Sequence, residues 1–316
     1  MDEFQLIRTF FQRQYADPQI ICGSGDDAAT LQPKPGYVLC VSSDSSVAGV
    51  HFLEKWDPSI IASKAVTANV SDIAAMAAEP KWVTVALTLP SVDKDWLSAF
   101  SKGLFRTLDA DNIALVGGDI TRGPLSINIT IFGECLPEDA TYRHGAKVGD
   151  IIYVTGSLGA PSLAVDWLNK TDVDEDVRQY LMSRLQKPHA RTDCRQLISQ
   201  FANSCIDVSD GLVGDLEHIC HRSHVGANII SEQIPIDKMV KNQVPDQAMD
   251  YALHGGDEYQ LCFTVAKEQK RAAELLAEKM GLSIYPIGHI IQEQEINLMV
   301  GGKKLPLQSR SYRHFT

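Results

Sequence analysis

Aspartates recur in this sequence directly after short apolar runs, and most of them stand beside serine or glycine. The segments are GSGDDAA, SSDSS, GGDITRG and IDVSDGL, which carry Asp27, Asp44, Asp119 and Asp210. Carboxylate and hydroxyl oxygens are the ligands that hard cations such as Mg²⁺ prefer, and ligands gather at strand ends in α/β sheets. The pattern predicts several cations shared between the protein and a phosphate-bearing ligand.

The segment CGSGDDAATL places Gly23, Gly25 and Ala28 at the spacing of a loose dinucleotide-binding loop. However, Asp26 and Asp27 stand where that loop would present bare backbone N–H groups to a phosphate. A carboxylate repels a phosphate by ~1 kcal/mol per charge pair in water and ~4 kcal/mol near a protein surface. A divalent cation reverses this effect, so Asp27 is predicted to hold a metal ion. An Asx turn that caps the next segment is the structural alternative.

Two further acids have both a functional and a structural interpretation. Asp44, with Ser42 and Ser43, follows an apolar run and offers oxygen ligands to a hard cation, but the segment could also be a polar turn. Asp72 falls in the apolar stripe of an alanine-rich helix, where a buried carboxylate needs a partner or a metal. Alternatively, Ser71 and Asp72 cap a fresh helical turn after a break.

Glycine pairs precede acids at two places. Gly117 and Gly118 end a buried run before Asp119 and remove side chains where a backbone approaches a partner closely. HGGDEYQL repeats this arrangement with Asp257 and Glu258. Both segments are therefore predicted to lie at the site.

The segment CIDVSDGL combines Asp207, Ser209 and Asp210 ahead of a helical pattern. Ser209 or Asp210 could be an ordinary helix N-cap. Taken together, the acid-bearing segments exceed what turns and caps require, and we expect polyphosphate bound through several magnesium ions.

Composition limits the class of protein. The chain has 316 residues, 44% of them hydrophobic, which suggests roughly two domains. A net charge of −11 argues against a nucleic-acid partner or an anionic membrane surface. No apolar stretch approaches the ~20 residues that span a bilayer. The first residues lack the basic region of a signal peptide, and seven cysteines without a C-x-x-C pair suggest a reducing compartment, so we expect a cytoplasmic protein.

Strand and helix patterns alternate in both halves, which predicts two domains of an α/β sandwich type. Tyr37 to Val41 is predicted as a short strand that ends at SSDSS, and Asp57 with Pro58 is predicted to open a helix. NIALVGGD is predicted as a strand that breaks at its glycines, and LSINITIFG alternates strictly as a half-buried strand does. The polar segment RHGAKVGD suggests a boundary, which divides the chain into domains 1–146 and 147–316.

Six segments, in this order, resemble the sequence blocks of the bacterial thiamine-monophosphate kinases. They are GSGDDAA, VSSDSSVAGVHF, NVSDIAAMAAEP, GGDITRGP, IDVSDGL and GGDEY. The similarity runs from about residue 4 to Tyr312. It implies a two-domain fold of the aminoimidazole-ribonucleotide-synthetase type, in which two N-terminal sheets pair in a homodimer. It also implies transfer of the ATP γ-phosphoryl group to thiamine monophosphate.

The resemblance also implies residue roles. The implied magnesium ligands are Asp27, Ser42, Ser43, Asp44, Asp72, Asp119, Asp207 and Asp210. The implied ATP contacts are Gly118, Arg143 and Ser209, and the implied contacts to thiamine phosphate are His51, Asp257 and Tyr312. Arg143 and Asp210 are the expected catalytic residues. The family's last block often reads Gly-Gly-Glu-Asp-Tyr, whereas here the order of the two acids is exchanged.

The expected chemistry needs no general base. The attacking group would be a phosphate oxygen, and phosphate monoesters have a second pKa near ~6, so it is largely deprotonated at neutral pH. Magnesium ions would screen the repulsion between two anions, and Arg143 could neutralise charge on the transferred group. We expect direct in-line transfer without a phospho-enzyme.

Other functions share the fold. A selenophosphate synthetase would use a reactive cysteine, and Cys22 lies near the first acidic segment. A hydrogenase-maturation protein ends in a cysteine, whereas this chain ends Arg313-His314-Phe315-Thr316. A purine synthetase fits the SSDSSVAGVHF block less well. A non-catalytic sensor of magnesium–nucleotide is the alternative from a different class.

Overall fold

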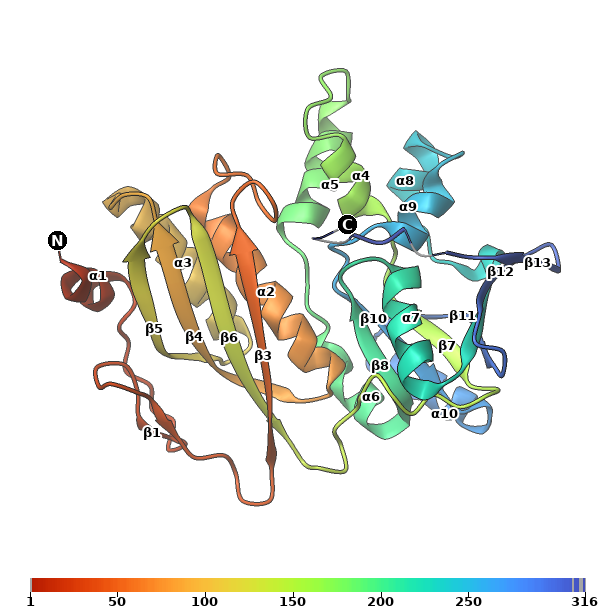
Figure 1. Ribbon diagram of the computed structural model, residues 1–316, viewed down its shortest axis with the longest axis horizontal. Coiled ribbons are helices and arrows are strands. Elements are labelled where there is room, and N and C mark those ends of the chain that lie inside the picture. Colours follow the sequence, from red (N-terminus) through yellow and green to blue (C-terminus); the bar gives the residue numbers. More distant parts are fainter. Residues whose placement is uncertain (1, 309, 313–314, 316) are drawn as a thin grey trace. The chain divides into compact units, whose positions relative to one another are not determined.

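The computed structural model describes residues 2–308, 310–312 and 315. Arg313, His314 and Thr316, named above for the chain's end, lie outside the described residues. The chain forms two compact units, residues 1–74 with 78–139 and residues 75–77 with 140–316, and each is described by itself (Figure 1).

The first unit combines a four-stranded sheet, a two-stranded sheet and three helices. The larger sheet has the strand order β3-β6-β4-β5, in which β4 and β5 are parallel and the other pairs are antiparallel. Helices α2 and α3 cover one face of it (Figure 1). The elements are α1 (Glu3–Phe10), β1 (Ile20–Cys22), β2 (Thr30–Leu31), β3 (Val38–Val47), α2 (Pro58–Ala75), β4 (Glu79–Leu89), α3 (Lys94–Ala110), β5 (Ala114–Arg122) and β6 (Ser126–Cys135).

Strand β6 shows why this sheet forms. Ile127, Ile129 and Ile131 alternate with partly buried polar residues, and all three isoleucines are buried. Successive side chains of a strand point to opposite faces, so these three pack on the helix-covered face. The predicted alternation is confirmed.

Two predicted strand ends are wrong. Strand β3 does not stop at Val41 but pairs with β6 through all ten residues to Val47, so Asp44 lies within a strand. Strand β5 does not break at its glycines but continues to Arg122, after an irregularity in its pairing with β4, so Asp119 also lies within a strand. Serine, aspartate and glycine have low strand propensity, but here pairing with a well-packed neighbour strand outweighs it.

Helix α2 begins as predicted and then runs without interruption. The Asp57 carboxylate accepts a hydrogen bond from the Ser59 N–H at 2.7 Å, directly before the first helical residue, Pro58. The helix continues to Ala75, so Asp72 does not cap a new turn after a break. That structural alternative for Asp72 is wrong, because the backbone around it keeps its helical bonds.

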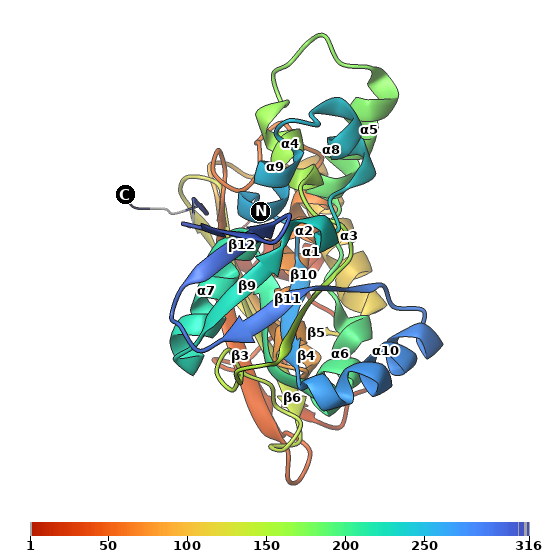
Figure 2. The same cartoon turned by 90° about the vertical axis from the view of Figure 1, so that its right-hand side faces the viewer.

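The second unit is built on a seven-stranded sheet of the order β13-β12-β9-β11-β7-β10-β8. Helix α7 lies on one of its faces, and α6 and α10 lie on the other (Figure 2). The strands are β7 (Ile151–Thr155), β8 (Ala202–Val208), β9 (Gly226–Ile230), β10 (Gln260–Val265), β11 (Ile284–Ile291), β12 (Ile296–Val300) and β13 (Lys303–Pro306). The helices are α4 (Ala160–Asp166), α5 (Glu175–Gln186), α6 (Arg195–Phe201), α7 (Leu212–Ser223), α8 (Lys238–Gln243), α9 (Ala248–His254) and α10 (Lys270–Lys279), with short 3₁₀ turns at Thr192–Cys194, Ser231–Gln233 and Lys267–Gln269.

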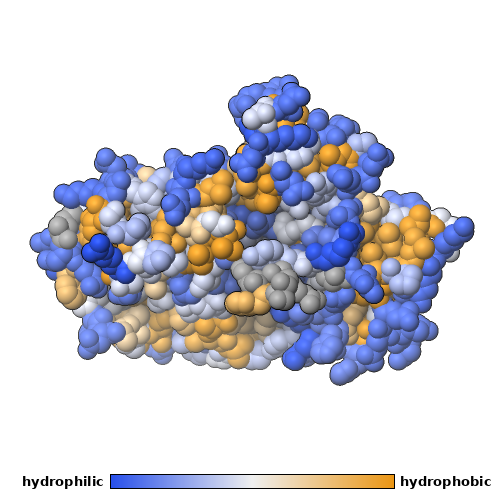
Figure 3. Space-filling view, turned by 45° about the horizontal axis from the view of Figure 1, so that its top comes forward, coloured by the Kyte–Doolittle hydropathy of each residue, from blue (hydrophilic) through white to orange (hydrophobic). Residues whose placement is uncertain are grey.

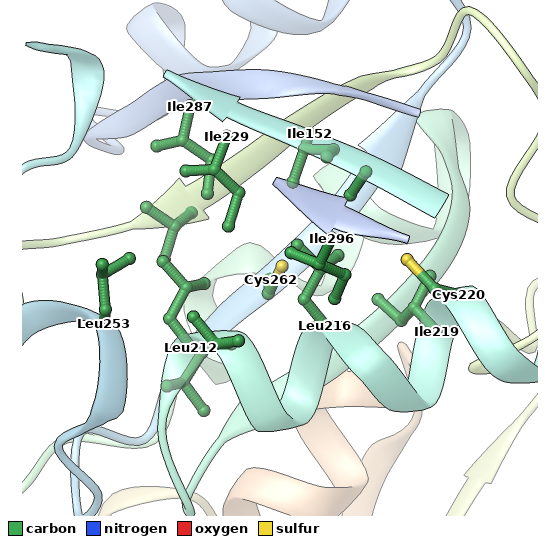
Figure 4. Packing of buried hydrophobic residues seen from close by; sticks show 14 of the residues in the cluster. Ile152, Leu212, Leu216, Ile219, Cys220, Ile229, Leu253, Cys262, Ile287 and Ile296 are labelled. Atoms are coloured by element: carbon green, nitrogen blue, oxygen red, sulfur yellow. The ribbon is translucent and has the colours of Figure 1, made fainter. Parts of the chain in front are cut away.

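The core beneath α7 fixes the start of that helix. Leu212, Leu216 and Ile219 recur at helical spacing and pack toward Ile152 of β7 and Ile229 of β9 (Figure 4). Each side chain of this kind contributes about 1.5–3 kcal/mol when it is fully buried. Because Leu212 is fully buried, the loop directly before α7 is held close to the sheet.

Both units combine a main sheet with helices, which confirms the predicted α/β class with two domains of this type. None of the described helices has both the length and the apolar character needed to cross a membrane. On the face shown in Figure 3, apolar residues reach the surface in separate patches between hydrophilic ones.

Candidate functional site

Strand β3 and helix α2 bring three of the predicted ligands together in the first unit. The Ser42 hydroxyl donates a hydrogen bond to Oδ2 of Asp72 at 2.5 Å. The Asp44 N–H donates to Oδ1 of Asn69, one turn earlier on α2, at 3.2 Å. Residues 42 and 44 are two apart on a strand, so they share the face that α2 covers. We call Ser42, Asp44 and Asp72 the strand–helix group.

Ser43 belongs to the opposite face of the same strand. Its hydroxyl lies 3.0 Å from the hydroxyl of Thr130 on β6 and 3.5 Å from Oδ1 of Asn128. The Asn128 amide in turn donates to the backbone oxygen of Asp44 at 3.3 Å. The side chains of Ser42 and Ser43, both predicted as ligands, therefore lie on opposite faces of β3.

Asp27 and Asp119 line one cavity of the first unit. The cavity has a volume of about 740 Å³, and Gly118 also lines it. Its apolar side includes Phe4 and Ile7 of helix α1. Two acids separated by 92 positions in the sequence thus line one hollow of the surface.

The backbone at Gly118 requires glycine. Its φ is +147°, and a Cβ atom there would lie 2.0 Å from the backbone oxygen of Val85 on the neighbouring strand. At Gly117 the nearest atom would be a side-chain carbon of Thr84 at 3.6 Å, an ordinary contact. Close packing of β5 on β4 therefore depends on Gly118 and not on Gly117.

His51 follows the end of β3 and is half-buried. Its Nδ1 accepts a hydrogen bond from the Val47 N–H at 3.0 Å. An accepting Nδ1 carries no proton, so the neutral ring is protonated at Nε2. This bond orients the ring beside the strand that carries Asp44.

In the second unit, two segments distant in sequence are joined by backbone hydrogen bonds. The Asp257 N–H donates to the Ser209 oxygen and the Tyr259 N–H donates to the Val208 oxygen, both at 2.8 Å. Asp257 and Tyr259 have φ values of +63° and +52°, which non-glycine residues seldom adopt. The Tyr259 hydroxyl also donates to the Asp257 carboxylate at 3.0 Å. We call residues 208–212 and 255–259 the loop junction.

Ser311 and Tyr312, near the end of the chain, also contact the second unit here. The Tyr312 N–H donates to the Asp210 oxygen at 3.3 Å, and the Ser311 hydroxyl accepts from the Gly214 N–H at 3.2 Å. The structure therefore brings together Ser209 and Asp210 of one predicted block, Asp257 of another and Tyr312 near the chain's end.

Asp215 is a residue of this site that sequence reasoning missed. It is buried on α7, and its Oδ2 accepts hydrogen bonds from the N–H groups of Ser209, Asp210 and Gly211 at 3.1, 3.2 and 3.1 Å. Burial and the charge of Asp210 raise the pKa of Asp215 to about 7, against the effect of the three N–H donors. Gly211 is the N-cap of α7, without a side-chain cap bond, so the interpretation of Ser209 or Asp210 as the N-cap is wrong.

Two other predicted residues lie on or beside β8. Asp207 is buried near the end of the strand and pairs in register with Leu261 of β10. Arg143 is exposed, and the residue before it, Tyr142, accepts a hydrogen bond at its backbone oxygen from the Cys205 N–H at 2.9 Å. The structure thus places Arg143 alongside the strand that leads into the loop junction.

Glu258, named in the sequence only as the neighbour of Asp257, is a buried acid of this site. Its Oε1 accepts a hydrogen bond from the Gly159 N–H, and its Oε2 is buried without a hydrogen-bond partner among the described residues. Burial raises the pKa of Glu258 to about 8, and the charges of Asp237 and Asp257 act in the same direction. A buried acid directly after the exchanged Asp257 was not visible as such in the sequence.

The donor atoms of the first unit fit magnesium better than a softer metal. Within the described part of the chain, no three His, Cys, Asp or Glu side chains are grouped so that they could hold a metal ion. Mg²⁺ is usually bound through one or two carboxylates, while waters and substrate phosphates complete its shell. The strand–helix group supplies carboxylate and hydroxyl oxygens of this kind.

Comparison with known proteins identifies the family. Residues 25–135 match the N-terminal domain of AIR synthase related proteins, and residues 147–301 match the C-terminal domain. The thiamine-monophosphate kinase of Buchnera aphidicola (subsp. Acyrthosiphon pisum) is 37% identical over 99% of this chain and 98% of its own length. The crystal structure of the thiamine-monophosphate kinase from Stenotrophomonas maltophilia has a TM-score of 0.84 and 39% identity, covering 90% of this chain and 92% of that one.

A solved complex of AaThiL with AMPPCP and TMP is also similar, with a TM-score of 0.80 and 29% identity over 90% of this chain and 89% of that one. The order of the acidic segments, the two-domain fold and this near-full-length similarity agree. The chain belongs to the thiamine-monophosphate kinase family.

Proposed function

We propose that this chain transfers the γ-phosphoryl group of ATP to thiamine monophosphate, which gives thiamine diphosphate and ADP. The observation that carries this proposal is the similarity to thiamine-monophosphate kinases over nearly the whole chain. A relative of the same fold binds AMPPCP and TMP together, as a kinase for this pair of substrates must.

Magnesium is the proposed metal. Asp27, Ser42, Ser43, Asp44, Asp72 and Asp119 of the first unit, and Asp207 and Asp210 of the second, would hold it. Bound Mg²⁺ would neutralise phosphate charge and so let two anionic substrates approach each other. One cavity supports this assignment. Asp27 and Asp119 line it together with Gly118, the residue at which β5 packs closely on the backbone of β4.

The remaining residues would bind and orient the substrates. Gly118, Arg143 and Ser209 would contact ATP, and the Arg143 guanidinium would neutralise charge that develops on the transferred group. His51, Asp257 and Tyr312 would contact thiamine monophosphate. The attacking phosphate oxygen is already deprotonated at neutral pH, so these residues need to position it and not to remove a proton.

We assign the metal- and ATP-binding part and the dimer contact to domain 1–146, and completion of the nucleotide and substrate site to domain 147–316. Exposed apolar side chains on β3 support the homodimer. Val38, Leu39, Val41 and Val47 are between 37% and 58% exposed along one strand at the edge of the sheet. Pairing of two such sheets would cover them.

We also propose a cytoplasmic location. All seven cysteines lie within the described residues and carry free thiols, which suits a reducing compartment.

One assay tests the function against its alternatives. The purified protein is incubated with ATP, Mg²⁺ and thiamine monophosphate, and thiamine diphosphate is measured. We expect stoichiometric thiamine diphosphate and ADP, and none after EDTA. A sensor would bind the nucleotide without forming product. A selenophosphate synthetase would depend on Cys22, so full activity of Cys22→Ser would exclude that alternative.

A further inference from the structure

Six backbone groups of the segment 208–211 are hydrogen-bonded within the second unit. The three backbone oxygens of Val208, Ser209 and Asp210 accept hydrogen bonds from the N–H groups of Tyr259, Asp257 and Tyr312. The N–H groups of Ser209, Asp210 and Gly211 all donate to one carboxylate oxygen of Asp215. What the segment can offer to a ligand is therefore its side-chain oxygens, the Ser209 hydroxyl and the exposed Asp210 carboxylate.

This arrangement is unusual for the start of a helix. The first N–H groups of a helix, with the positive end of its dipole, commonly bind a phosphate or another anion. Here one carboxylate oxygen of Asp215 occupies the three N–H groups directly before α7, and the exposed Asp210 carboxylate adds negative charge beside them. These three N–H groups are thereby closed to a bare phosphate, and the segment favours a cation instead.

We propose that Asp215 is a positioning residue that makes the segment 208–212 select a metal-bound phosphate over a bare one. The proposal rests on the proposed function, since it concerns how the same site discriminates the magnesium complex of its nucleotide from the free anion. Asp215 acts through the backbone of Ser209 and Asp210 and does not itself touch the substrate.

Removal of the Asp215 carboxylate should have two separate effects. Loss of the acceptor frees three N–H donors for another acceptor, such as a phosphate oxygen. Loss of the charge removes the local preference for a cation. A residue that only stabilised the fold would produce neither effect, because its loss would lower the amount of active protein without changing which ligand is bound.

The test compares three variants of the full-length chain. Asp215→Ala removes both acceptor and charge. Asp215→Asn keeps an oxygen acceptor and removes the charge. Glu217→Gln is the matched control, because Glu217 lies on the same helix and none of its hydrogen bonds reach the segment 208–212 among the described residues.

Two quantities are measured. Titration calorimetry with inorganic tripolyphosphate in EDTA reports binding of a bare polyphosphate without any turnover. We expect no heat for the wild type, Asp215→Asn or Glu217→Gln, and saturable binding for Asp215→Ala. The Mg²⁺ concentration for half-maximal activity at saturating ATP should rise about 10-fold or more in Asp215→Ala and at least about 3-fold in Asp215→Asn, with an unchanged value in Glu217→Gln.

Other outcomes overturn the proposal. If Asp215→Ala lowers activity or melting temperature but gains no binding of tripolyphosphate, Asp215 is merely structural. Should Asp215→Ala not fold, an unchanged Mg²⁺ requirement in Asp215→Asn has the same meaning. The calorimetric readout does not depend on phosphoryl transfer, so a failure of the proposed function itself would appear separately, as absence of thiamine diphosphate from the wild type.

Discussion

The strand–helix group of the first unit and the loop junction of the second hold acids of the same type by different means. Ser42 and Asp72 meet through their side chains, which extend from a regular strand and a regular helix. Asp210 and Asp257 are held through their backbones, by bonds that link three segments and Asp215. A substitution in the first group should remove a ligand and leave the backbone in place, whereas one at the loop junction should move the backbone itself.

The largest effect on activity is expected for Asp72→Asn. The amide oxygen still accepts the Ser42 hydroxyl, so the fold is kept, but the charge that would bind metal is lost. We expect kcat to fall by about 10²–10³-fold and the melting temperature to stay near that of the wild type. Glu54→Gln, which removes an exposed charge from the same unit, is the control. Activity within a factor of two of the wild type would remove Asp72 from the metal site.

Gly118 and its neighbour provide a sharper comparison within one strand. Gly118→Ala forces a Cβ atom against the Val85 backbone at a positive φ, and we expect a loss of roughly 2–4 kcal/mol in the free energy of unfolding. Gly117→Ala meets only an ordinary contact and should change it by less than about 1 kcal/mol. Urea unfolding measures both. Equal effects would contradict the role given to the backbone at Gly118.

The loop junction should show its own pH dependence through Glu258. Its pKa is about 8 in the folded chain, against 4.5 for the free side chain. Between these values only the unfolded state ionises, so the free energy of unfolding falls as pH rises through this window. Glu258→Gln should remove a fall on the order of 3–5 kcal/mol. The free energy of unfolding is measured for the wild type and Glu258→Gln between about pH 5 and pH 8. The same pH dependence in both proteins would refute a buried, protonated Glu258.

The smallest effect is expected for Ser43→Ala. Its hydroxyl bonds to Thr130 on the face away from α2, so we expect less than about a 3-fold change in the Mg²⁺ requirement, against about 10-fold for Ser42→Ala. If the two alanine variants behave alike, the separation of the two faces of β3 has no functional meaning.

Sequence reasoning succeeded where a local pattern decides the structure. The alternation of Ile127, Ile129 and Ile131 predicted a half-buried strand, and Asp57 before Pro58 predicted a helix start. The sequence pattern predicted too short a strand at β3, because serine and aspartate disfavour strands. Only the ten-residue pairing with β6 shows that Ser42, Ser43 and Asp44 belong to the strand. The local pattern could not show this, since the partner lies about 85 positions away.

The role of Asp215 and the burial of Glu258 were missed for a related reason. Asp215 stands at an ordinary place in a helix. Its role depends on the loop before that helix, where Gly211 has a φ of +127° and three consecutive N–H groups donate to the Asp215 carboxylate. Glu258 follows an acid that was already singled out, and its burial depends on the approach of Gly159 from a distant turn. The signal that could have found Asp215 is its spacing, four residues after Gly211 in SDGLVGDL.

The ten-residue register of β3 on β6 has a consequence for how this chain can change in length. Deletion of one residue within β3 would turn the side chains of Ser42 and Asp44 to the outer face and bring Ser43 toward α2 in their place. Such a chain would still contain Ser42, Asp44 and Asp72, but it would lose the contact between Ser42 and Asp72. By contrast, an insertion at Gly301 and Gly302, in the turn between β12 and β13, would meet open space. Insertions and deletions should therefore be absent from β3 and tolerated in that hairpin.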